Sequence, residues 1–127
     1  MEIKTHGQIS AELCGSPVEL SEGFCRVRMT TAPEMRADER ELVHGGFVFG
    51  MADYAAMLAV NHPYVVLGSA ESKFLKPVRV GEEIEATAEL REVSGRKHIV
   101  SVTVTRGEET VMTGMLTCFT LDRHVLG

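Results

Sequence analysis

One stretch of the sequence, from Val43 to Pro63, constrains the fold more than any other. It reads V-H-G-G-F-V-F-G-M-A-D-Y-A-A-M-L-A-V-N-H-P, with Asp53 as the one acid among apolar residues. This composition predicts a helix that ends before the closing proline, because the residue before a proline avoids helical backbone angles. A helix that is apolar on nearly all sides belongs in a protein interior. We therefore expect a buried helix that carries one carboxylate and begins at Gly45 and Gly46.

Size, charge and cysteine content narrow the class of protein. The chain has 127 residues, so we interpret residues 1–127 as one domain with a single core. A net charge of −5 argues against a nucleic-acid partner, because nucleic-acid-binding surfaces are basic. Cys14, Cys25 and Cys118 show no C-x-x-C spacing, which predicts free thiols in a reducing compartment. No signal peptide is evident, so we expect a cytoplasmic protein. The apolar helix is shorter than the roughly 20 residues that a bilayer requires, so we expect no membrane partner.

Alternation of apolar and polar residues predicts strands on both sides of this helix. The expected strands are residues 18–31 (with a turn at Glu22-Gly23), 64–80, 83–93, 99–105 and 109–121. Short strands separated by turns are typical of an antiparallel meander. We expect an α+β fold in which a curved sheet of about five strands wraps around one long central helix. One sheet leaves part of the helix and a sheet edge uncovered, so we expect at least a homodimer.

Two motifs connect this pattern to a known family. The triplet H-G-G at His44-Gly45-Gly46 is followed by Asp53, nine residues after the histidine. The segment S-K-F-L-K-P-V-R-V-G-E-E-I at 72–84 looks like an F-x-x-P-x-x-x-G-D strand and turn. Over about residues 20–121 the chain resembles the hotdog-fold acyl-CoA thioesterases, particularly the phenylacetic-acid-pathway and 4-hydroxybenzoyl-CoA branch. The resemblance implies hydrolysis of an acyl-CoA or acyl-carrier-protein thioester by a dimer or a dimer of dimers. It implies no metal and no cofactor, since coenzyme A is part of the substrate.

The residues themselves provide a physical account of thioester hydrolysis. The free N–H groups of Gly45 and Gly46, aided by the helix dipole, would stabilise negative charge on the carbonyl oxygen. Asp53 would act on a water as a general base, or directly as a nucleophile, and its apolar neighbours should raise its pKa. Gly45 and Asp53 are eight residues apart, about 12 Å along one helix. We therefore expect Gly45 of one subunit to face Asp53 of the other.

Each of these residues also has a purely structural interpretation. Asp53 could accept a hydrogen bond from a backbone N–H, and the two glycines could serve only as turn residues. His44 could be only an N-terminal capping residue, or it could orient the acyl carbonyl or the loop. Met57 is interpreted as core or as lining of the acyl pocket.

Coenzyme A requires cations for its phosphates, and a local cluster can supply them on an acidic protein. The candidates lie after the central helix and at the Ser94-Gly95 turn: Lys73, Lys76, Arg79, Arg96, Lys97 and His98.

Three positions depart from the pattern of these thioesterases. Asp38 stands six residues before His44, where Asn or Gln commonly points at the active site. Glu41 replaces a usual glycine, and Met57 stands where some members have a hydroxyl residue that holds the water. A second carboxylate near Asp53 would repel it and raise one of the two pKa values. The reaction path is therefore left open.

Two other functions compete with hydrolysis. A hotdog 3-hydroxyacyl thioester dehydratase would use His44 and Asp53 as a base and acid pair, although Gly45-Gly46 does not match the H-F-P signature of those enzymes. The other alternative is a non-catalytic acyl-CoA binding module, as in hotdog ligand sensors of lipid synthesis. The chain has no spare helix-turn-helix, which disfavours direct DNA binding.

Overall fold

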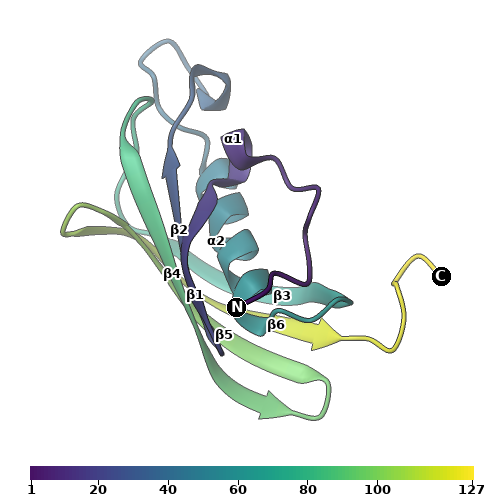
Figure 1. Ribbon diagram of the computed structural model, residues 1–127. Helices are drawn as coiled ribbons and strands as arrows, with labels where there is room; N and C mark the ends of the chain where they lie inside the picture. The colour runs from purple at the N-terminus through teal and green to yellow at the C-terminus, as the bar shows by residue number, and fades with distance from the viewer.

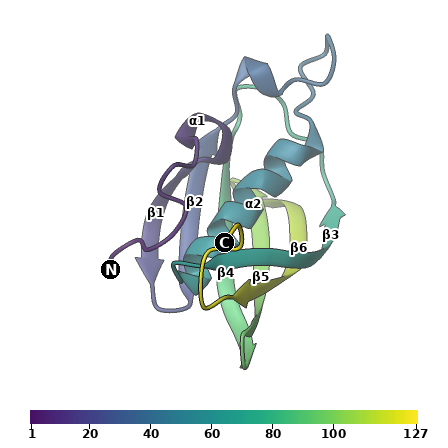
Figure 2. The same cartoon turned by 90° about the vertical axis from the view of Figure 1, so that its right-hand side faces the viewer.

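A curved antiparallel sheet of six strands wraps around one long helix in the computed structural model, which describes residues 1–127 (Figure 1). The elements in chain order are α1 Ala11–Cys14, β1 Ser16–Ser21, β2 Phe24–Thr30, the 3-10 turn η1 Pro33–Met35, α2 Gly45–Val60, β3 Val65–Phe74, β4 Glu83–Ser94, β5 Lys97–Arg106 and β6 Glu109–Thr120. Figure 2 shows α2 lying across the concave face of the sheet. This confirms the α+β hotdog fold expected from the sequence.

The central helix matches its prediction closely. It spans Gly45–Val60 and ends at Asn61, whose left-handed backbone (φ 50°, ψ 52°) closes the last turn. The helix packs on β2, β4 and β5, and its middle turns are buried. No helix in the chain has both the length and the apolar character to cross a membrane.

The strand order is β1-β2-β4-β5-β6-β3, which differs from a simple meander. Strands β4, β5 and β6 follow one another as predicted, but β3 pairs with β6 at the far edge instead of with β4. The sheet has six strands because the residues on the two sides of the Glu22-Gly23 turn form separate strands, β1 and β2. The prediction that a strand runs from 64 to 80 was wrong beyond Phe74. There the chain leaves the sheet, and Pro77 lacks the N–H that a ladder requires.

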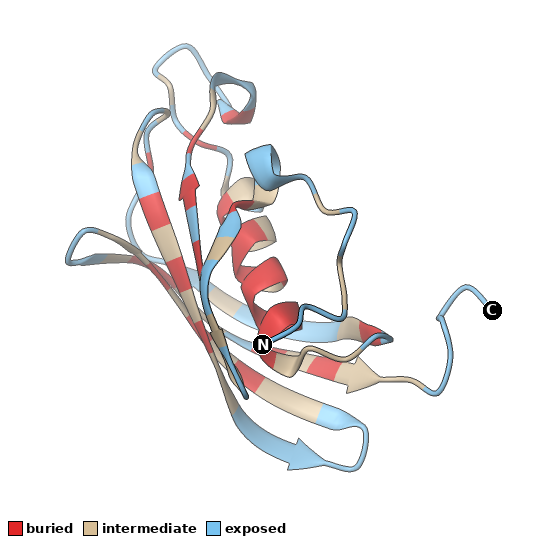
Figure 3. Cartoon of the chain, in the orientation of Figure 1, coloured by how far each residue is buried: buried red, intermediate tan, exposed pale blue.

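The core lies between α2 and the concave face of the sheet (Figure 3). The predicted inward faces are confirmed, with buried Cys25, Val27 and Met29 on β2 and buried Val100, Val102 and Val104 on β5. Strand β4 faces the helix with the small residues Ala86 and Ala88, both fully buried. The helix also presents alanines, namely Ala52, Ala55, Ala56 and Ala59. Small residues on both sides let the helix lie close to the sheet.

The N-terminal segment is fastened to the C-terminal end of α2. The side-chain amide of Asn61 donates to the carbonyl oxygen of Glu2 (2.8 Å) and accepts from the N–H of Lys4 (2.8 Å). Further along, the ring of His6 lies 6.3 Å from that of Tyr54 on the helix. The first residues of the chain therefore cover part of the helix that the sheet leaves exposed.

Candidate active site

The chain before α2 is anchored on both sides, and this fixes where the helix begins. The N–H of Val43 donates to Val78 (2.8 Å), and the N–H of His44 donates to Met35 (2.8 Å). The first turn then closes with a bond from the N–H of Phe47 to the carbonyl oxygen of His44 (3.0 Å). The N–H groups of Gly45 and Gly46 donate no hydrogen bond within the chain. Two donors at the positive end of the helix dipole are thus available to a ligand.

His44 covers this helix start with its ring. It is the N-cap residue by position, but its side chain makes no capping hydrogen bond. A Cβ atom at Gly46 would lie 3.2 Å from Cδ2 and 3.3 Å from Nε2 of this ring. The imidazole is exposed and packs edge-to-face on Phe47, with 6.2 Å between ring centroids. Gly46 therefore leaves the space that the His44 ring occupies.

An apolar hollow of about 230 Å³ opens beside Gly45. It is lined by Val43, Gly45, Val48, Phe74, Leu75, Lys76, Pro77, Val78 and Val111. The aromatic ring of Phe74 would be 3.6 Å from a Cβ atom at Gly45, which is ordinary van der Waals contact. The structure thus brings together the H-G-G triplet and the F-x-x-P segment, which are about thirty residues apart in the sequence.

Asp53 lies two turns further along the same helix and is half-buried. Its Oδ1 atom is buried without a hydrogen-bond partner, so this oxygen does not bind a backbone N–H. Burial raises the pKa of the Asp53 carboxyl above its ordinary value. Burial also raises the pKa of the Cys14 thiol, and the nearby Asp53 charge raises it further. Cys118 on β6 shows the same two causes, burial first, with a pKa of about 12.

A single chain does not bring Asp53 and the two glycine amides onto one substrate atom. Both groups belong to one straight helix, eight residues and about 12 Å apart. The hollow beside Gly45 does not reach Asp53.

The two other residues predicted to contact substrate, Met57 and Asp38, differ in their surroundings. Met57 is 1% exposed and belongs to the core. Asp38 is exposed, and its Oδ1 accepts the N–H groups of Arg40 (2.9 Å) and Leu42 (3.3 Å). In this chain Asp38 therefore shapes the loop before the helix.

Glu41, which stands where glycine is usual, has a left-handed backbone with φ of 68°. Only a few per cent of residues other than glycine adopt this region. Its carbonyl oxygen accepts the N–H of Val80 (2.9 Å), which ties the loop to the segment after β3. The loop therefore keeps a backbone conformation that suits glycine, although the residue at this position is Glu41.

The predicted phosphate-binding cations form two separate groups. Lys73, Lys76 and Arg79 lie at the end of β3 and after it, on the side of the helix start. Arg96 and Lys97 lie at the β4–β5 turn, and Lys97 pairs with Phe119 near the other end of β6. Arg96 is bound to Asp122 at 2.6 Å. A further exposed cation near the helix start, Arg40, was not among the predicted ones, because charged residues in a loop are usually just solvated.

Comparison with known proteins agrees with the fold and the motifs. A profile of the thioesterase superfamily matches residues 41–113. The crystal structure of the uncharacterized protein PH1136 from Pyrococcus horikoshii superposes with a TM-score of 0.99 at 51% identity, covering 100% of this chain and 98% of that chain. A mutant of the phenylacetic acid degradation protein PaaI from Thermus thermophilus superposes with a TM-score of 0.80 at 27% identity, covering 87% of this chain and 97% of that chain.

Curated relatives carry more varied names. A methylthioribose-1-phosphate isomerase from Aquifex aeolicus (strain VF5) is 50% identical over 123 residues, which make up 96% of this chain and 27% of that protein. A transcription factor FapR from Caldanaerobacter subterraneus subsp. tengcongensis is 26% identical over 119 residues, 93% of this chain and 60% of FapR. The chain thus spans only part of either relative, and their names describe longer proteins. The matching profile, the sheet wrapped on α2 and the adjoining motifs together place this chain in the thioesterase superfamily, with the hotdog fold.

Proposed function

We infer that the protein hydrolyses an acyl-CoA thioester to a free acid and coenzyme A. One observation carries this proposal: α2 combines two unbonded glycine N–H groups at its start with a half-buried, unpartnered carboxylate in its middle. The N–H groups match the negative charge that develops on a thioester carbonyl oxygen. The carboxylate has a raised pKa, which makes it a stronger base than a surface aspartate.

The proposed reaction needs only these groups and a water molecule. Asp53 takes a proton from the water while the oxygen of that water attacks the carbonyl carbon. The N–H groups of Gly45 and Gly46 bind the resulting oxyanion. The C–S bond then breaks, and the proton held by Asp53 goes to the leaving thiolate. In the alternative route Asp53 attacks directly, and water hydrolyses the resulting anhydride. Direct attack expels the thiolate before water reacts, so rapid quenching of a single turnover distinguishes the two: only this route leaves the acyl group covalently bound to Asp53.

The proposed active unit is a homodimer, in which each site combines the glycines of one subunit with Asp53 of the other. Strand β3 supports this arrangement because it is one of the two edge strands of the sheet, and most of its residues from Gly68 to Phe74 are exposed. An edge strand of ten residues offers N–H and C=O groups to a second copy. Two such dimers could associate further. The free thiols Cys14, Cys25 and Cys118 suit the reducing cytoplasm that we propose as its location.

Subunit complementation tests this proposal directly. Asp53→Ala removes the base, and Gly45→Pro removes one N–H donor. Proline is well tolerated at the first helical position, and His44 already has the extended backbone (φ −63°, ψ 132°) that precedes proline. The matched control, Gly45→Ala, keeps the N–H group. Each single variant should be inactive, and the control should remain active.

A mixture of the two inactive variants, dissociated and reassembled, should regain about a quarter of wild-type activity. Half of the dimers are then mixed, and each mixed dimer holds one intact site. If the site lay within one chain, the mixture would stay inactive. A panel of short, long and aryl acyl-CoAs, followed with a thiol-detecting reagent, would identify the acyl group.

A second candidate function is acyl-CoA binding without turnover. The similarity to a transcription factor and the departures at Asp38, Glu41 and Met57 favour it. This function requires that acyl-CoA binds without release of thiol and that Asp53→Asn leaves binding unchanged. Measured thiol release by the wild-type protein decides between the two functions.

A further inference from the structure

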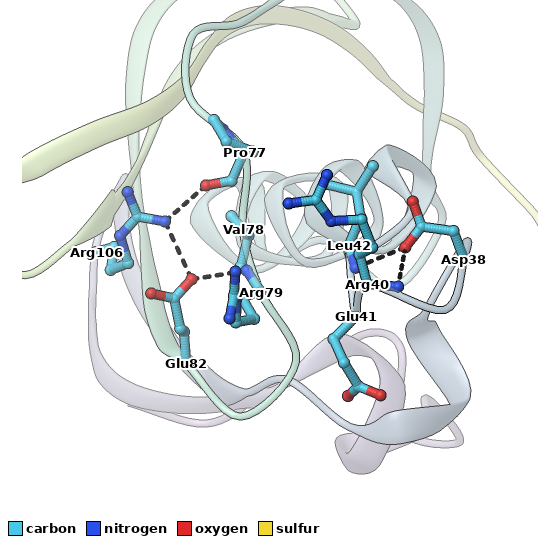
Figure 4. A pocket seen from close by; sticks show the side chains of 9 residues that line it. All are labelled: Asp38, Arg40, Glu41, Leu42, Pro77, Val78, Arg79, Glu82 and Arg106. Carbon is cyan, nitrogen blue, oxygen red and sulfur yellow. Dashed lines mark hydrogen bonds and ion pairs between the residues drawn. The ribbon is translucent and has the colours of Figure 1, made fainter.

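A second, polar hollow of about 540 Å³ lies next to the helix start (Figure 4). The loop before α2 and the loop after β3 form most of it and are joined by the bridge between Leu42 and Arg79, and the end of β5 completes it. Its lining residues are Asp38, Arg40, Glu41, Leu42, Pro77, Val78, Arg79, Glu82 and Arg106. Pro77 and Val78 also line the apolar hollow beside Gly45. The two hollows are therefore neighbours that share one wall.

Two of the acids in this polar hollow are already engaged by the chain. Glu82 accepts from the guanidinium of Arg106 (3.1 Å) and from the N–H of Arg79 (2.6 Å). Arg106 also bonds the carbonyl oxygen of Pro77 (2.6 Å) and the carboxylate of Glu109. Asp38 accepts two backbone N–H groups of its own loop.

The guanidinium groups of Arg40 and Arg79 have no such partner. Neither takes part in any of the ion pairs of the chain, and both residues are exposed. Figure 4 shows both side chains at the opening between the two segments, with the carboxylate of Glu41 extending away from them. Guanidinium groups bind phosphate with two parallel hydrogen bonds, so a pair of free ones suits a phosphorylated ligand.

The position of this pair matches the shape of a CoA thioester. Arg40 and Gly45 are five residues apart, so their backbones are separated by at most about 17 Å. In a CoA thioester, the pantetheine arm likewise places a spacer between the thioester and the phosphates. A thioester at Gly45 can therefore be joined to phosphates at Arg40. The cations at the β4–β5 turn fit less well, because Arg96 is already bound to Asp122.

We propose that Arg40 and Arg79 bind the phosphate groups of coenzyme A in this polar hollow, while the thioester lies at Gly45 and Gly46 of the same subunit. The inference rests on the proposed function, since it takes acyl-CoA as the substrate. The proposed phosphate site combines Arg79, which the sequence analysis had named, with Arg40, which it had not. The remaining candidate cations take no part in it.

Calorimetry on the wild-type protein and on the Arg40→Gln/Arg79→Gln double variant tests the site without any need for turnover. The probes are coenzyme A, 3′-dephospho-CoA and pantetheine. The double variant should bind coenzyme A at least about tenfold more weakly and bind pantetheine unchanged, because only the phosphates meet the arginines. Arg123→Gln is the matched control, an exposed arginine without an ion pair elsewhere in the chain, and it should bind like wild type.

Kinetics with two substrates separate the phosphate site from the reaction. The double variant should show a KM for acyl-CoA raised at least about tenfold, with a weaker dependence on salt. Its kcat/KM for the acyl thioester of N-acetylcysteamine, which has no phosphate, should stay at the wild-type value. Equal losses with both substrates, or unchanged binding of coenzyme A, would overturn the phosphate site. A wild-type protein that binds coenzyme A through these arginines yet releases no thiol would refute the hydrolase and leave the site intact.

Discussion

The first turn of α2 and its middle turns differ in almost every physical respect. At the first turn Gly46 and His44 are exposed, and two N–H groups are unbonded. In the middle, the residues around Asp53 are almost fully buried, and one carboxylate oxygen has no partner. One end of the helix therefore offers positive electrostatic potential to a ligand, whereas the middle destabilises negative charge.

This difference teaches how one helix can supply both halves of a hydrolytic site. An oxyanion site needs accessible donors, and a carboxylate base needs an apolar environment that raises its pKa. One position on a helix cannot be both accessible and enclosed by apolar residues, but two positions on the helix can meet one requirement each. Two copies of the helix, arranged side by side, would bring the two environments together.

The largest effect is expected at the middle of the helix. Asp53→Asn keeps the shape of the side chain but removes the base, so turnover should fall about a hundredfold or more. Steady-state thiol release from an acyl-CoA measures this. Glu92→Gln, at an exposed acid, should remain fully active. Wild-type turnover of the Asp53→Asn variant would show that the carboxylate in the middle of the helix has no catalytic role.

At the first turn, the loss of one N–H donor should have a comparable effect on turnover. Gly45→Pro deletes an N–H group, and loss of one oxyanion donor typically lowers kcat by about 10²–10³. Gly45→Ala adds a methyl group toward Phe74 at an uncrowded 3.6 Å, so it should keep kcat and mainly disfavour bulky acyl groups. Equal kcat values for the two variants would show that the N–H of Gly45 does no catalytic work.

The raised pKa of Asp53 should appear in the pH dependence of the rate. As pH falls, kcat/KM should decrease tenfold per unit once Asp53 becomes protonated. Because burial raises this pKa, the midpoint should lie above the value of about 3.9 for an ordinary aspartate. A midpoint at or below that value would mean that water reaches the carboxylate freely.

The same burial should make Asp53 unfavourable for stability. A carboxyl with a raised folded pKa binds protons more tightly in the folded state, so its ionisation lowers stability as pH rises above the unfolded pKa. Asp53→Asn should therefore raise Tm by a few degrees at neutral pH. The gain should shrink as pH falls from the raised folded pKa towards about 4, and it should vanish below that value, where the carboxyl is neutral in both states. A thermal melt series across pH measures this, and a lower Tm at neutral pH would contradict it.

The smallest effect is a change in thiol reactivity. Cys14 is half-buried, and the charge of Asp53 contributes to its raised pKa, whereas Cys25 and Cys118 have pKa values of about 12. Under native conditions we expect a disulfide reagent to label Cys14 first. Asp53→Asn should accelerate that labelling several-fold, because the thiolate is the reactive form. An unchanged rate would show that the carboxylate does not act on this thiol.

The sequence predicted the fold well where local patterns decide the structure. The helix bounds follow from an apolar composition closed by Pro63, and the inward faces of β2, β4 and β5 follow from alternation, and each segment carries these signals by itself. The place of β3 beside β6 did not follow, because a pairing of distant strands depends on how the whole sheet closes around the helix. The motif predicted that Asp53 and the two glycines lie on one helix, as the structure has them, whereas their catalytic roles stay a prediction.

Other parts of the site depended on tertiary contacts. The free state of Arg40 and Arg79 is visible only once Glu82 is seen to bind Arg106. The two backbone N–H groups that Asp38 accepts from its own loop likewise appear only in three dimensions, and its contact with substrate stays a prediction.

The hydrogen bonds between the Asn61 side chain and the N-terminal segment have a consequence for how further sequence could be attached to this domain. Its two hydrogen bonds hold residues 2 to 4 against the C-terminal end of α2, so a tag or a fused domain placed before Met1 would emerge there (Figure 1). Such a fusion would start about a helix length, roughly 24 Å for 16 residues, from the glycine amides. The domain can therefore be carried on a larger polypeptide while its helix start stays open.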